Sequence, residues 1–384
     1  MLRPGHALML LLTSLLAIGV VAVHSAGVDL GSSQSFDFAD LLTTRVTLMA
    51  VLACGVAWLT SFAPIDLLSD ATAGRRLAVI LFTISMGLLL LVHVPGIGRE
   101  VNGARRWLTI GGLGFQPSEI AKWSLVIIMA WYVANRAEVL QGYRSGFLPG
   151  LGIAVLLVLP IVSEDLGTAV LMSAVAICML VAAGCRVWHA ASLLPLAVLG
   201  FVAAVLVSSY RIDRLRAFLD PYADPQGYGY HILQSMASIS GGGLAGRGLG
   251  NSVQKFGYLP EDTTDFVFSV ISEELGIAGV LVVVGLLMAI LVVGLRIARR
   301  ATTIHHKVLV LGIMLTLGMQ ALINLMVVTG MAPTKGIALP LVSWGGTGWL
   351  MTSACLGLVW AVDRRTADRS ADQAAPTALP VGNE

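Results

Sequence analysis

Long uninterrupted apolar runs constrain the fold of this chain more than any other feature. Helical residues rise about 1.5 Å each, so roughly 20 apolar residues cross a bilayer core about 30 Å thick. We find about ten such runs, near residues 7–24, 42–61, 77–95, 120–134, 146–163, 166–184, 189–209, 274–295, 308–329 and 341–362. The sequence therefore predicts an all-α polytopic membrane protein with about ten transmembrane helices, the first of them a retained signal anchor.

Composition excludes several other classes of protein. Apolar residues make up 57% of the chain and charged residues only 12%, which a water-soluble protein does not show. The four cysteines lie within or at the ends of apolar runs without CxxC spacing, so we expect neither a disulfide framework nor a zinc site. Gly241, Gly243 and Gly246 match GxGxxG but follow no predicted strand, so a nucleotide site is not expected. We also expect no nucleic-acid partner.

Basic residues predict the orientation. One set of connections and ends carries Arg3, Arg75, Arg76, Arg136, Arg144, Arg186, Arg296, Arg299, Arg300, Lys307, Arg364, Arg365 and Arg369. Short loops rich in arginine and lysine face the cytoplasm, so both termini are expected there. Residues 210–268 then form a large extracytoplasmic loop between the seventh and eighth helices. We expect residues 1–365 to form one transmembrane domain and residues 366–384 a disordered cytoplasmic tail.

Acidic residues crowd the end of the large loop. Glu261, Asp262 and Asp265 lie within one short segment that leads into the eighth apolar run. They either cap a helix and face water, or one of them has a tuned pKa and accepts a proton from a substrate hydroxyl. Glu273 and Glu274 follow, either as ordinary interfacial acids or as part of an acidic stripe that descends toward the bilayer.

Basic residues also occur on the outer side, where the charge rule disfavours them. Arg105 and Arg106 precede a tryptophan, and they either bind phosphate or anchor the chain at the interface. Glu119 and Lys122 are three residues apart at the start of a helix, so they can pair with each other as well as face a cavity. An ionisable pair at this depth is a functional candidate.

Two further segments break the apolar pattern. Asp165 lies between two apolar runs, where it either caps the following helix or takes part in a site. Residues 333–346 contain Lys335 and Ser343 among glycines and prolines, before the last apolar run. Irregular backbone of this kind is tolerated at membrane depth only when it is buried in protein or lines a wet cavity.

At these residues the chain resembles the SEDS proteins (shape, elongation, division and sporulation), the family of RodA, FtsW and SpoVE. The resemblance runs from about residue 100 to 350 and is strongest over 211–276. The matching motifs are Asp220-Pro221, Asp224-Pro225, Gly229-Tyr230-His231, Gln234-Ser235, Gly248-Leu249-Gly250-Asn251-Ser252, Gln254-Lys255, Leu259-Pro260-Glu261 and Thr264-Asp265-Phe266. The segments 248–252 and 333–336 resemble the FtsW and SpoVE branch more than RodA.

The resemblance implies a peptidoglycan glycosyltransferase that polymerises lipid II, the undecaprenyl-pyrophosphate-linked disaccharide-pentapeptide, with inversion to a β-1,4 linkage. Asp265 would be the general base, while Arg106, Lys122 and Lys255 would neutralise the departing pyrophosphate. The other residues expected to contact substrate are Arg105, Glu119, Asp165, Gln234, Ser235, Glu261, Lys335 and Ser343. This account requires Asp265 to lie near Arg106 and Lys122 in a chamber open to the outer leaflet.

The resemblance also implies a setting and partners. The protein would lie in the bacterial inner membrane and act beside a class B penicillin-binding protein, other division or elongation proteins and membrane lipids. A divalent cation, Mg²⁺ or Mn²⁺, is left open as a cofactor. A lipid II flippase and a noncatalytic division scaffold are the rival functions. The chain departs from the family pattern at Glu164-Asp165 and at Leu341-Val342-Ser343-Trp344, where relatives show Pro-Asp and Phe-x-Ser-Tyr.

Overall fold

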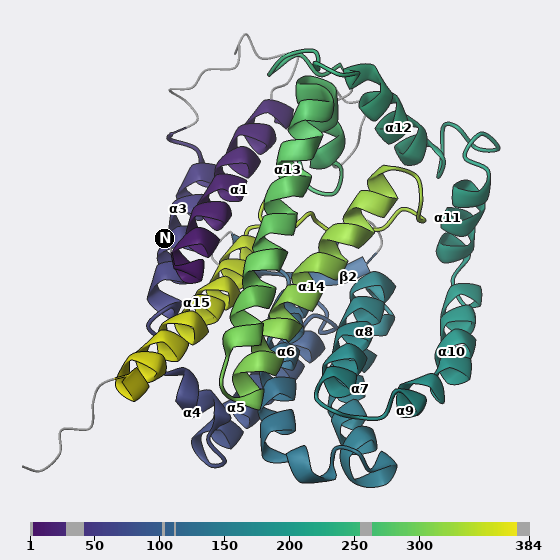
Figure 1. Ribbon diagram of the computed structural model, residues 1–384. Coiled ribbons are helices and arrows are strands. Elements are labelled where there is room, and N and C mark those ends of the chain that lie inside the picture. The colour runs from purple at the N-terminus through teal and green to yellow at the C-terminus, as the bar shows by residue number, and fades with distance from the viewer. Residues whose placement is uncertain (1–2, 28–41, 102–103, 111–112, 254–262, 375–384) are drawn as a thin grey trace, which may run out of the picture.

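The computed structural model describes residues 3–27, 42–101, 104–110, 113–253 and 263–374. They form a bundle of long helices with short helices at both its upper and its lower end in Figure 1. The longer helices are α1 (Pro4–Ala26), α3 (Arg45–Thr60), α5 (Ala73–Leu91), α6 (Pro117–Asn135), α7 (Leu148–Val162), α8 (Leu166–Ala182), α10 (Leu194–Leu206), α13 (Val267–Arg300), α14 (Ile304–Val328) and α15 (Thr347–Ala374). The shorter ones are α4 (Ile65–Ser69), η1 (Ala137–Val139), η2 (Tyr143–Phe147), α9 (Val187–Ala191), α11 (Ser209–Leu219) and α12 (Tyr230–Gly242).

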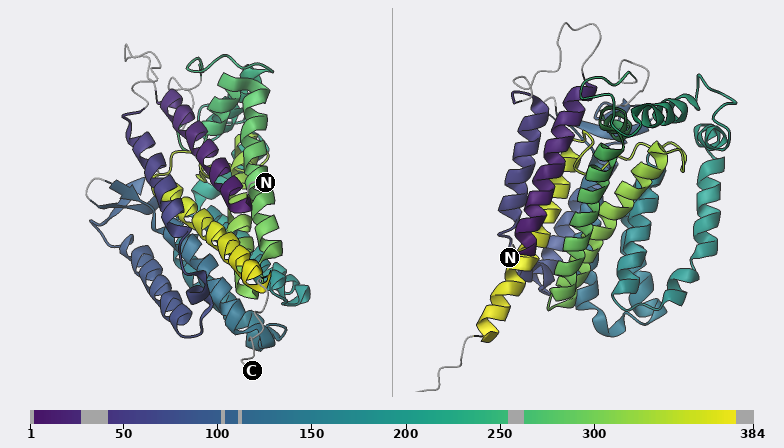
Figure 2. Two further views of the ribbon diagram at one scale, coloured as in Figure 1. Left: turned by 60° about the vertical axis from the view of Figure 1, so that its left-hand side comes forward. Right: turned by 45° about the horizontal axis from the view of Figure 1, so that its top comes forward.

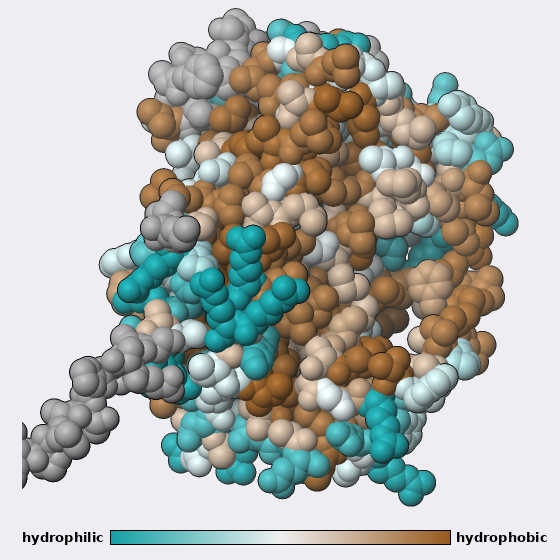
Figure 3. Space-filling view, in the orientation of Figure 1, coloured by the Kyte–Doolittle hydropathy of each residue, from teal (hydrophilic) through white to brown (hydrophobic). Residues whose placement is uncertain are grey.

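The helical bundle has the composition of a membrane protein. Six helical segments of the described residues are long and apolar enough to cross a bilayer, and α3 and α8 are shorter apolar helices. Figure 3 shows hydrophobic side chains over much of one face, with hydrophilic ones at its upper and lower ends and in a patch left of centre. Each of the ten predicted apolar ranges contains a helix, which confirms the helical architecture. The number of membrane crossings stays a prediction.

A small antiparallel sheet corrects the all-α prediction. Its strands are β1 (Gly98–Val101), β2 (Ala104–Ile110) and β3 (Leu113–Phe115), paired in that order. The residues between successive strands read Asn102-Gly103 and Gly111-Gly112. These dipeptides are the ones that two-residue hairpin turns favour, so the sequence carried a strand signal that the apolar runs obscured.

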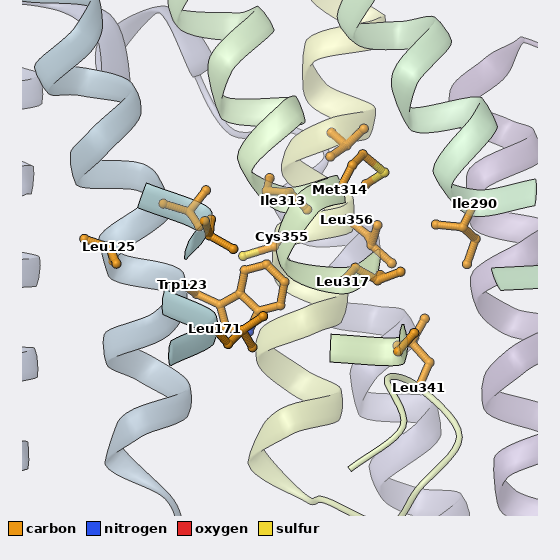
Figure 4. Close-up of a cluster of buried hydrophobic side chains, with 14 of the residues drawn as sticks. Trp123, Leu125, Leu171, Ile290, Ile313, Met314, Leu317, Leu341, Cys355 and Leu356 are labelled. Atoms are coloured by element: carbon orange, nitrogen blue, oxygen red, sulfur yellow. The ribbon is translucent and has the colours of Figure 1, made fainter. Parts of the chain in front are cut away.

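The core of the bundle lies around α14. This helix packs against α6, α8, α13 and α15, and its buried residues occupy more than one face. In Figure 4, Trp123 of α6, Ile313 of α14 and Cys355 of α15 gather in one hydrophobic cluster. Burial on several sides lets α14 carry polar side chains toward the interior, where they bond to protein rather than to lipid.

Helix α10 differs from the rest of the bundle. None of its residues is buried, although it is strongly apolar. Figure 1 and the right-hand view of Figure 2 both show it standing apart from α7 and α8, joined to the bundle through α9 and α11. Its apolar side chains therefore face surroundings other than protein, which in a membrane protein are lipid tails.

Helix α13 is broken near its upper end by Gly276. This glycine has φ 62° and ψ −158°, a backbone conformation that residues other than glycine rarely adopt. The break frees the carbonyls of Glu273 and Glu274, which accept hydrogen bonds from the N–H groups of Arg247 and Gly248, both at 2.9 Å. Backbone groups of residues 243–248 thus form hydrogen bonds with α13 on both sides of its break.

The side chains of Glu273 and Glu274 are buried, not interfacial. Glu273 accepts hydrogen bonds from the hydroxyls of Ser238 (3.0 Å) and Ser252 (2.5 Å) and pairs with Arg247 Nη1 at 3.2 Å. Glu274 is buried beside α1 and accepts a hydrogen bond from the Ser25 hydroxyl of that helix at 2.7 Å. The two acids therefore fix α12, the following loop and α1 to the broken helix.

The C-terminal end extends further as helix than predicted. Helix α15 continues to Ala374, beyond the expected boundary at 365. Arg365 and Arg369 hold this extension against α4, because their guanidinium groups lie 2.6 Å and 3.0 Å from the carboxylate of Asp66. The expectation of disorder is thus wrong for the first part of the tail, and residues 375–384 lie outside the described residues.

Candidate active site

Asp265 and Arg106 meet beside Gly336, although the three residues come from distant parts of the chain. Asp265 precedes α13, Arg106 lies on β2, and Gly336 lies in the loop of residues 329–346 that joins α14 to α15. A Cβ atom added to Gly336 would lie 3.0 Å from Asp265 Oδ2 and 3.7 Å from Arg106 Nη1. A carboxylate and a guanidinium therefore approach one point of side-chain-free backbone.

Strand geometry separates the two adjacent arginines. Successive side chains of a strand point to opposite faces, so Arg105 and Arg106 on β2 have different surroundings. Arg106 is mostly buried, at 22% exposed, and its Nη1 lies 4.0 Å from Asp165 Oδ2. Arg105 is half exposed and pairs with Glu100 at 3.3 Å. Arg106 belongs to the site, whereas Arg105 has its charge partner on the neighbouring strand.

Asp165 caps α8, as one of its two predicted roles required, and its part in a substrate site stays a prediction. Its Oδ1 accepts a hydrogen bond from the N–H of Thr168 at 3.0 Å and its Oδ2 accepts one from the Thr168 hydroxyl at 2.7 Å, so it caps α8. The same carboxylate lies beside Arg106. A Cβ atom added to Gly167 would lie 2.9 Å from Lys335 Cδ and 3.5 Å from Asp165 Oδ1, so the lysine stem crosses the start of α8.

The side chain of Lys335 has a lowered pKa. Burial lowers the pKa of Lys335 to about 8; nearby Asp165 acts in the opposite direction, and the positive charges of Arg211 and Arg214 lower the pKa further. The lysine is thus surrounded by more positive than negative charge. Such an excess of fixed cations favours binding of an additional anion.

Two arginines of α11 belong to this cluster, and the sequence analysis missed them. Arg214 Nη1 donates to the carbonyl of Thr334 at 2.9 Å, and its guanidinium lies 4.4 Å from the ring centre of Tyr210. Burial lowers the pKa of Arg214, as does the charge of Arg106, while Asp265 is close enough to raise it. Their helical spacing of three residues was the available indication that Arg211 and Arg214 share a face.

Arg211 is held by the backbone at the upper ends of α7 and α10. Its two terminal nitrogens donate to the carbonyls of Ala204, Val162 and Ser163 at 2.7 to 2.9 Å. These bonds hold the charge in place through backbone carbonyls, and no ion pair to Arg211 is found among the described residues. We call Arg106, Arg211, Arg214 and Lys335 the cationic cluster.

Lys122 lies deeper and does not match its predicted role. The residue is 2% exposed, and its Nζ lies 2.7 and 2.8 Å from the two oxygens of Glu119 and 2.7 Å from Gln320 Oε1. An ammonium group has three N–H donors, and these three contacts use them. The geometry therefore leaves Lys122 no donor for a phosphate oxygen.

Other predicted contact residues have structural partners. Ser235 is fully buried and bonds to the Ser269 hydroxyl and the Val328 carbonyl, at 2.8 and 2.6 Å, where α12 packs on α13 and α14. Ser343 is also fully buried, and its Oγ accepts from the N–H of Leu339 at 2.8 Å. Neither hydroxyl is directed at the site. Gln234 is half-buried on α12, while Lys255 and Glu261 lie outside the described residues.

The described residues offer no obvious metal centre. Within the described ranges, no three His, Cys, Asp or Glu side chains are grouped so that they could hold a metal ion. A divalent cation as cofactor stays a prediction.

The whole chain matches proteins of peptidoglycan synthesis. Residues 6–368 match the family model FTSW_RODA_SPOVE, described as cell cycle protein. A probable peptidoglycan glycosyltransferase FtsW of Geobacter sp. (strain M18) is 38% identical over 94% of this chain and 97% of its own. The stage V sporulation protein E of Bacillus subtilis (strain 168) is 36% identical over 94% of this chain and 97% of its own.

Solved structures show the same fold. A chain from a peptidoglycan synthase complex, whose description concerns the coordination of polymerization and crosslinking, aligns with TM-score 0.71 and 29% identity over 94% of this chain and 97% of its own. The rod shape determining protein RodA of Thermus thermophilus aligns with TM-score 0.60 and 28% identity over 94% of this chain and 96% of its own. The matches span nearly the whole of both partners, so this multi-pass membrane protein belongs to the FtsW, RodA and SpoVE family of cell cycle proteins.

Proposed function

We propose that this protein polymerises lipid II into glycan strands at the outer face of the bacterial inner membrane, as an FtsW-like enzyme of cell division. The observation that carries the proposal is the meeting of Asp265 and Arg106 at Gly336, beside a cluster of fixed cations. Glycosyl transfer from a lipid pyrophosphate requires a general base and a positively charged group that binds the phosphates.

Asp265 acts as the general base in this mechanism. Its carboxylate accepts the proton of the acceptor sugar's 4-hydroxyl as that oxygen attacks the anomeric carbon of the donor. The bond from this carbon to the pyrophosphate breaks on the opposite face, so the configuration inverts and a β-1,4 linkage forms. The electron pair and the added negative charge leave with undecaprenyl pyrophosphate.

The cationic cluster stabilises the leaving group. Arg106 and Arg214 approach the loop that carries Lys335, beside Asp265; Arg106 lies 4.0 Å from Asp165 and Arg214 donates to the Thr334 carbonyl, so these charges are in place before substrate arrives. Prearranged charges in poorly hydrated surroundings stabilise a developing pyrophosphate more than water does. Arginine suits this role because its planar guanidinium matches phosphate oxygens.

The lipid tail of the substrate is expected to lie on the α10 side. This helix has no buried residue and leads directly into α11, which carries Arg211 and Arg214. A polyprenyl chain can therefore contact the apolar face of α10 while its pyrophosphate reaches the cationic cluster. Lipid-exposed apolar helices and fixed cations at their outer ends together match the two chemical halves of lipid II.

The proposed orientation places Asp265 outside the cytoplasm. Ten crossings, both termini in the cytoplasm and an extracytoplasmic loop over residues 210–268 would bring α11, α12 and the sheet to the outer leaflet. The many basic residues at the opposite end of the bundle support this orientation. A reporter fused after Leu219 should be extracytoplasmic, and cytoplasmic reporter activity would refute the orientation.

We further propose a class B penicillin-binding protein as the partner, with other division proteins and membrane lipids around the pair. The solved peptidoglycan synthase complex that this chain resembles couples polymerization to crosslinking by its own description. An enzyme of the same fold that builds glycan strands needs a transpeptidase to join them. The partner is therefore included in the test below.

The decisive experiment is reconstitution of the purified protein with its penicillin-binding partner in lipid vesicles that contain fluorescent lipid II. We expect muramidase-sensitive glycan polymer, and Asp265→Asn should reduce its rate by about 10²–10⁴-fold because a general base contributes that much. Asp213→Asn is the control, since this partly exposed acid pairs with the exposed Arg216 and should leave the rate unchanged.

Each rival function has its own outcome in the same vesicles. Transbilayer movement of lipid II without polymer, lost on substitution of Lys335 or Asp165, would replace the proposal with a flippase. Neither polymer nor movement, with the partner bound and folded, would favour a noncatalytic scaffold. Polymer that persists unchanged in Asp265→Asn would refute the assigned base.

A further inference from the structure

We infer that Lys122, Gln320 and Asn324 are positioning residues that hold the catalytic aspartate and the 329–346 loop together, and that Lys122 acts through Gln320 rather than on phosphate. This inference rests on the proposed function for its meaning in catalysis. Its physical basis is a continuous set of buried and partly buried hydrogen bonds from α6 through α14 to the loop.

Asn324 joins Asp265 to the loop. Its Nδ2 donates to the backbone carbonyl of Asp265 at 2.9 Å and to that of Ile337 at 2.8 Å. Asp265 precedes α13 and Ile337 follows Gly336, so one buried amide fixes the two backbone segments that approach each other at the site. Trp344 N–H adds a second link, because it donates to the carbonyl of Thr263 at 2.9 Å.

Gln320 extends the same set by one helical turn. Residues four apart share a face of a helix, so Gln320 and Asn324 both face the loop. Gln320 Nε2 donates to the carbonyl of Ala338 at 2.9 Å, while its Oε1 accepts from Lys122 at 2.7 Å. The amide orientation is thus determined, because only the oxygen can accept from the lysine.

Lys122 and Glu119 complete the set. The ammonium is saturated by Glu119 and Gln320, and the lysine itself is almost fully buried. Its charge orients the Gln320 oxygen, and the other end of that amide is then directed at Ala338. Displacement of reacting groups by about 1 Å costs on the order of 10²-fold in rate, so residues that only hold backbone can still govern the turnover number.

The first experiment is a double-mutant cycle on the reconstituted enzyme and partner. Lys122→Met, Gln320→Leu and the double variant are compared for kcat and KM with lipid II. We expect each single change to lower kcat about tenfold or more with KM within twofold, and the double variant to be no worse than the worse single, because the two act in series. Multiplied losses together with a raised KM would overturn the inference and restore Lys122 as a phosphate ligand.

Gln320→Glu separates the two ends of the amide. The new carboxylate keeps an acceptor for Lys122 but loses the N–H that holds Ala338, so kcat should fall although the lysine stays paired. Activity equal to that of the unchanged enzyme would contradict the inference. Leu322→Ala is the matched control on the same helix, since this side chain is 57% exposed and faces away from the loop.

A second measurement does not depend on activity. Amide hydrogen exchange over residues 336–344 should accelerate in Asn324→Ala and in Gln320→Glu but not in Leu322→Ala, with thermal unfolding showing that each variant is folded. Unchanged exchange would refute the positioning role whether or not the protein polymerises lipid II. Absence of polymer from the unsubstituted protein, with exchange altered as expected, would instead refute the proposed function alone.

Discussion

Helices α14 and α10 are both strongly apolar, yet they occupy opposite environments. Their candidate spans have the same mean hydropathy, but most of the α14 span is buried in protein while none of the α10 span is. The difference lies in the few polar residues of α14, among them Gln320 and Asn324, which need partners that lipid cannot supply. Apolar content places a helix in the membrane, and its polar exceptions show whether protein surrounds it.

This comparison divides the proposed enzyme into two halves. The α14 half holds the base and the 329–346 loop by direct hydrogen bonds, whereas the α10 half carries a lipid-facing helix and the arginines of α11. Small changes in packing should lower the activity when they are made in the first half. In the second half, the activity should depend mainly on the charges of the side chains.

The largest effect is expected at Gly336, in the half that α14 holds. Gly336→Ala adds a methyl group 3.0 Å from Asp265 Oδ2, closer than nine in ten real contacts, so the base or the loop must shift by a few tenths of an ångström. We expect kcat for polymerisation to fall by up to about 100-fold, the loss that a displacement of about 1 Å brings. Gly345→Ala is the control in the same loop, because its nearest contact would be a carbonyl oxygen at 3.9 Å. Equal rates for the two variants would remove Gly336 from the site.

A matched pair of glycines tests the contrast between the helices directly. A side chain added at Gly312 of α14 would meet Met179 at 2.7 Å and Val126 at 2.8 Å, whereas one added at Gly200 of α10 would meet nothing within 4 Å. Gly312→Leu should lower the free energy of unfolding by about 1–3 kcal/mol through overpacking, and Gly200→Leu should change it by less than about 0.5 kcal/mol. Thermal unfolding in one detergent measures both, and a comparable loss at Gly200 would show that α10 packs against protein.

The smallest effect concerns pH and the charge next to α11. Because the pKa of Lys335 is lowered to about 8, its positive charge is present below that pH and is lost as the pH rises through it. The KM for lipid II should therefore increase between pH 7 and 9, by roughly three- to tenfold for one lost phosphate contact. Lys335→Arg keeps its charge throughout this range and should flatten the profile. A profile that the arginine variant leaves unchanged would assign the titration to another group.

Much of this fold follows from local pattern, and the remainder depends on distant contacts. Apolar runs predicted the helix ranges, and the capping role of Asp165 followed from its place before a run. Partners far apart in sequence could not be predicted: Lys122 and Gln320 are 198 residues apart, and their bond turns an expected phosphate ligand into a buried support. Hydropathy likewise cannot distinguish lipid from protein surroundings, so the exposure of α10 was not foreseen.

The candidate site shows the same division. Asp265 could be named in advance because the family resemblance singles out its segment, and Arg106 because the charge rule disfavours a pair of arginines on the outer side. Arg211 and Arg214 were assigned to an outer loop, and only the packing of α11 against the 329–346 loop brings them to the site. Three-dimensional proximity, rather than residue type, decided which cations belong together.

The interruption of α13 at Gly276 makes the placement of the base depend on the outer loop. Residues 267–275 form a short separate helix with Asp265 just before one end, while the backbone of residues 243–248 is bonded to the other end. One short helix therefore connects the backbone of the outer loop to the segment that holds Asp265, and the break at Gly276 separates this connection from the rest of α13.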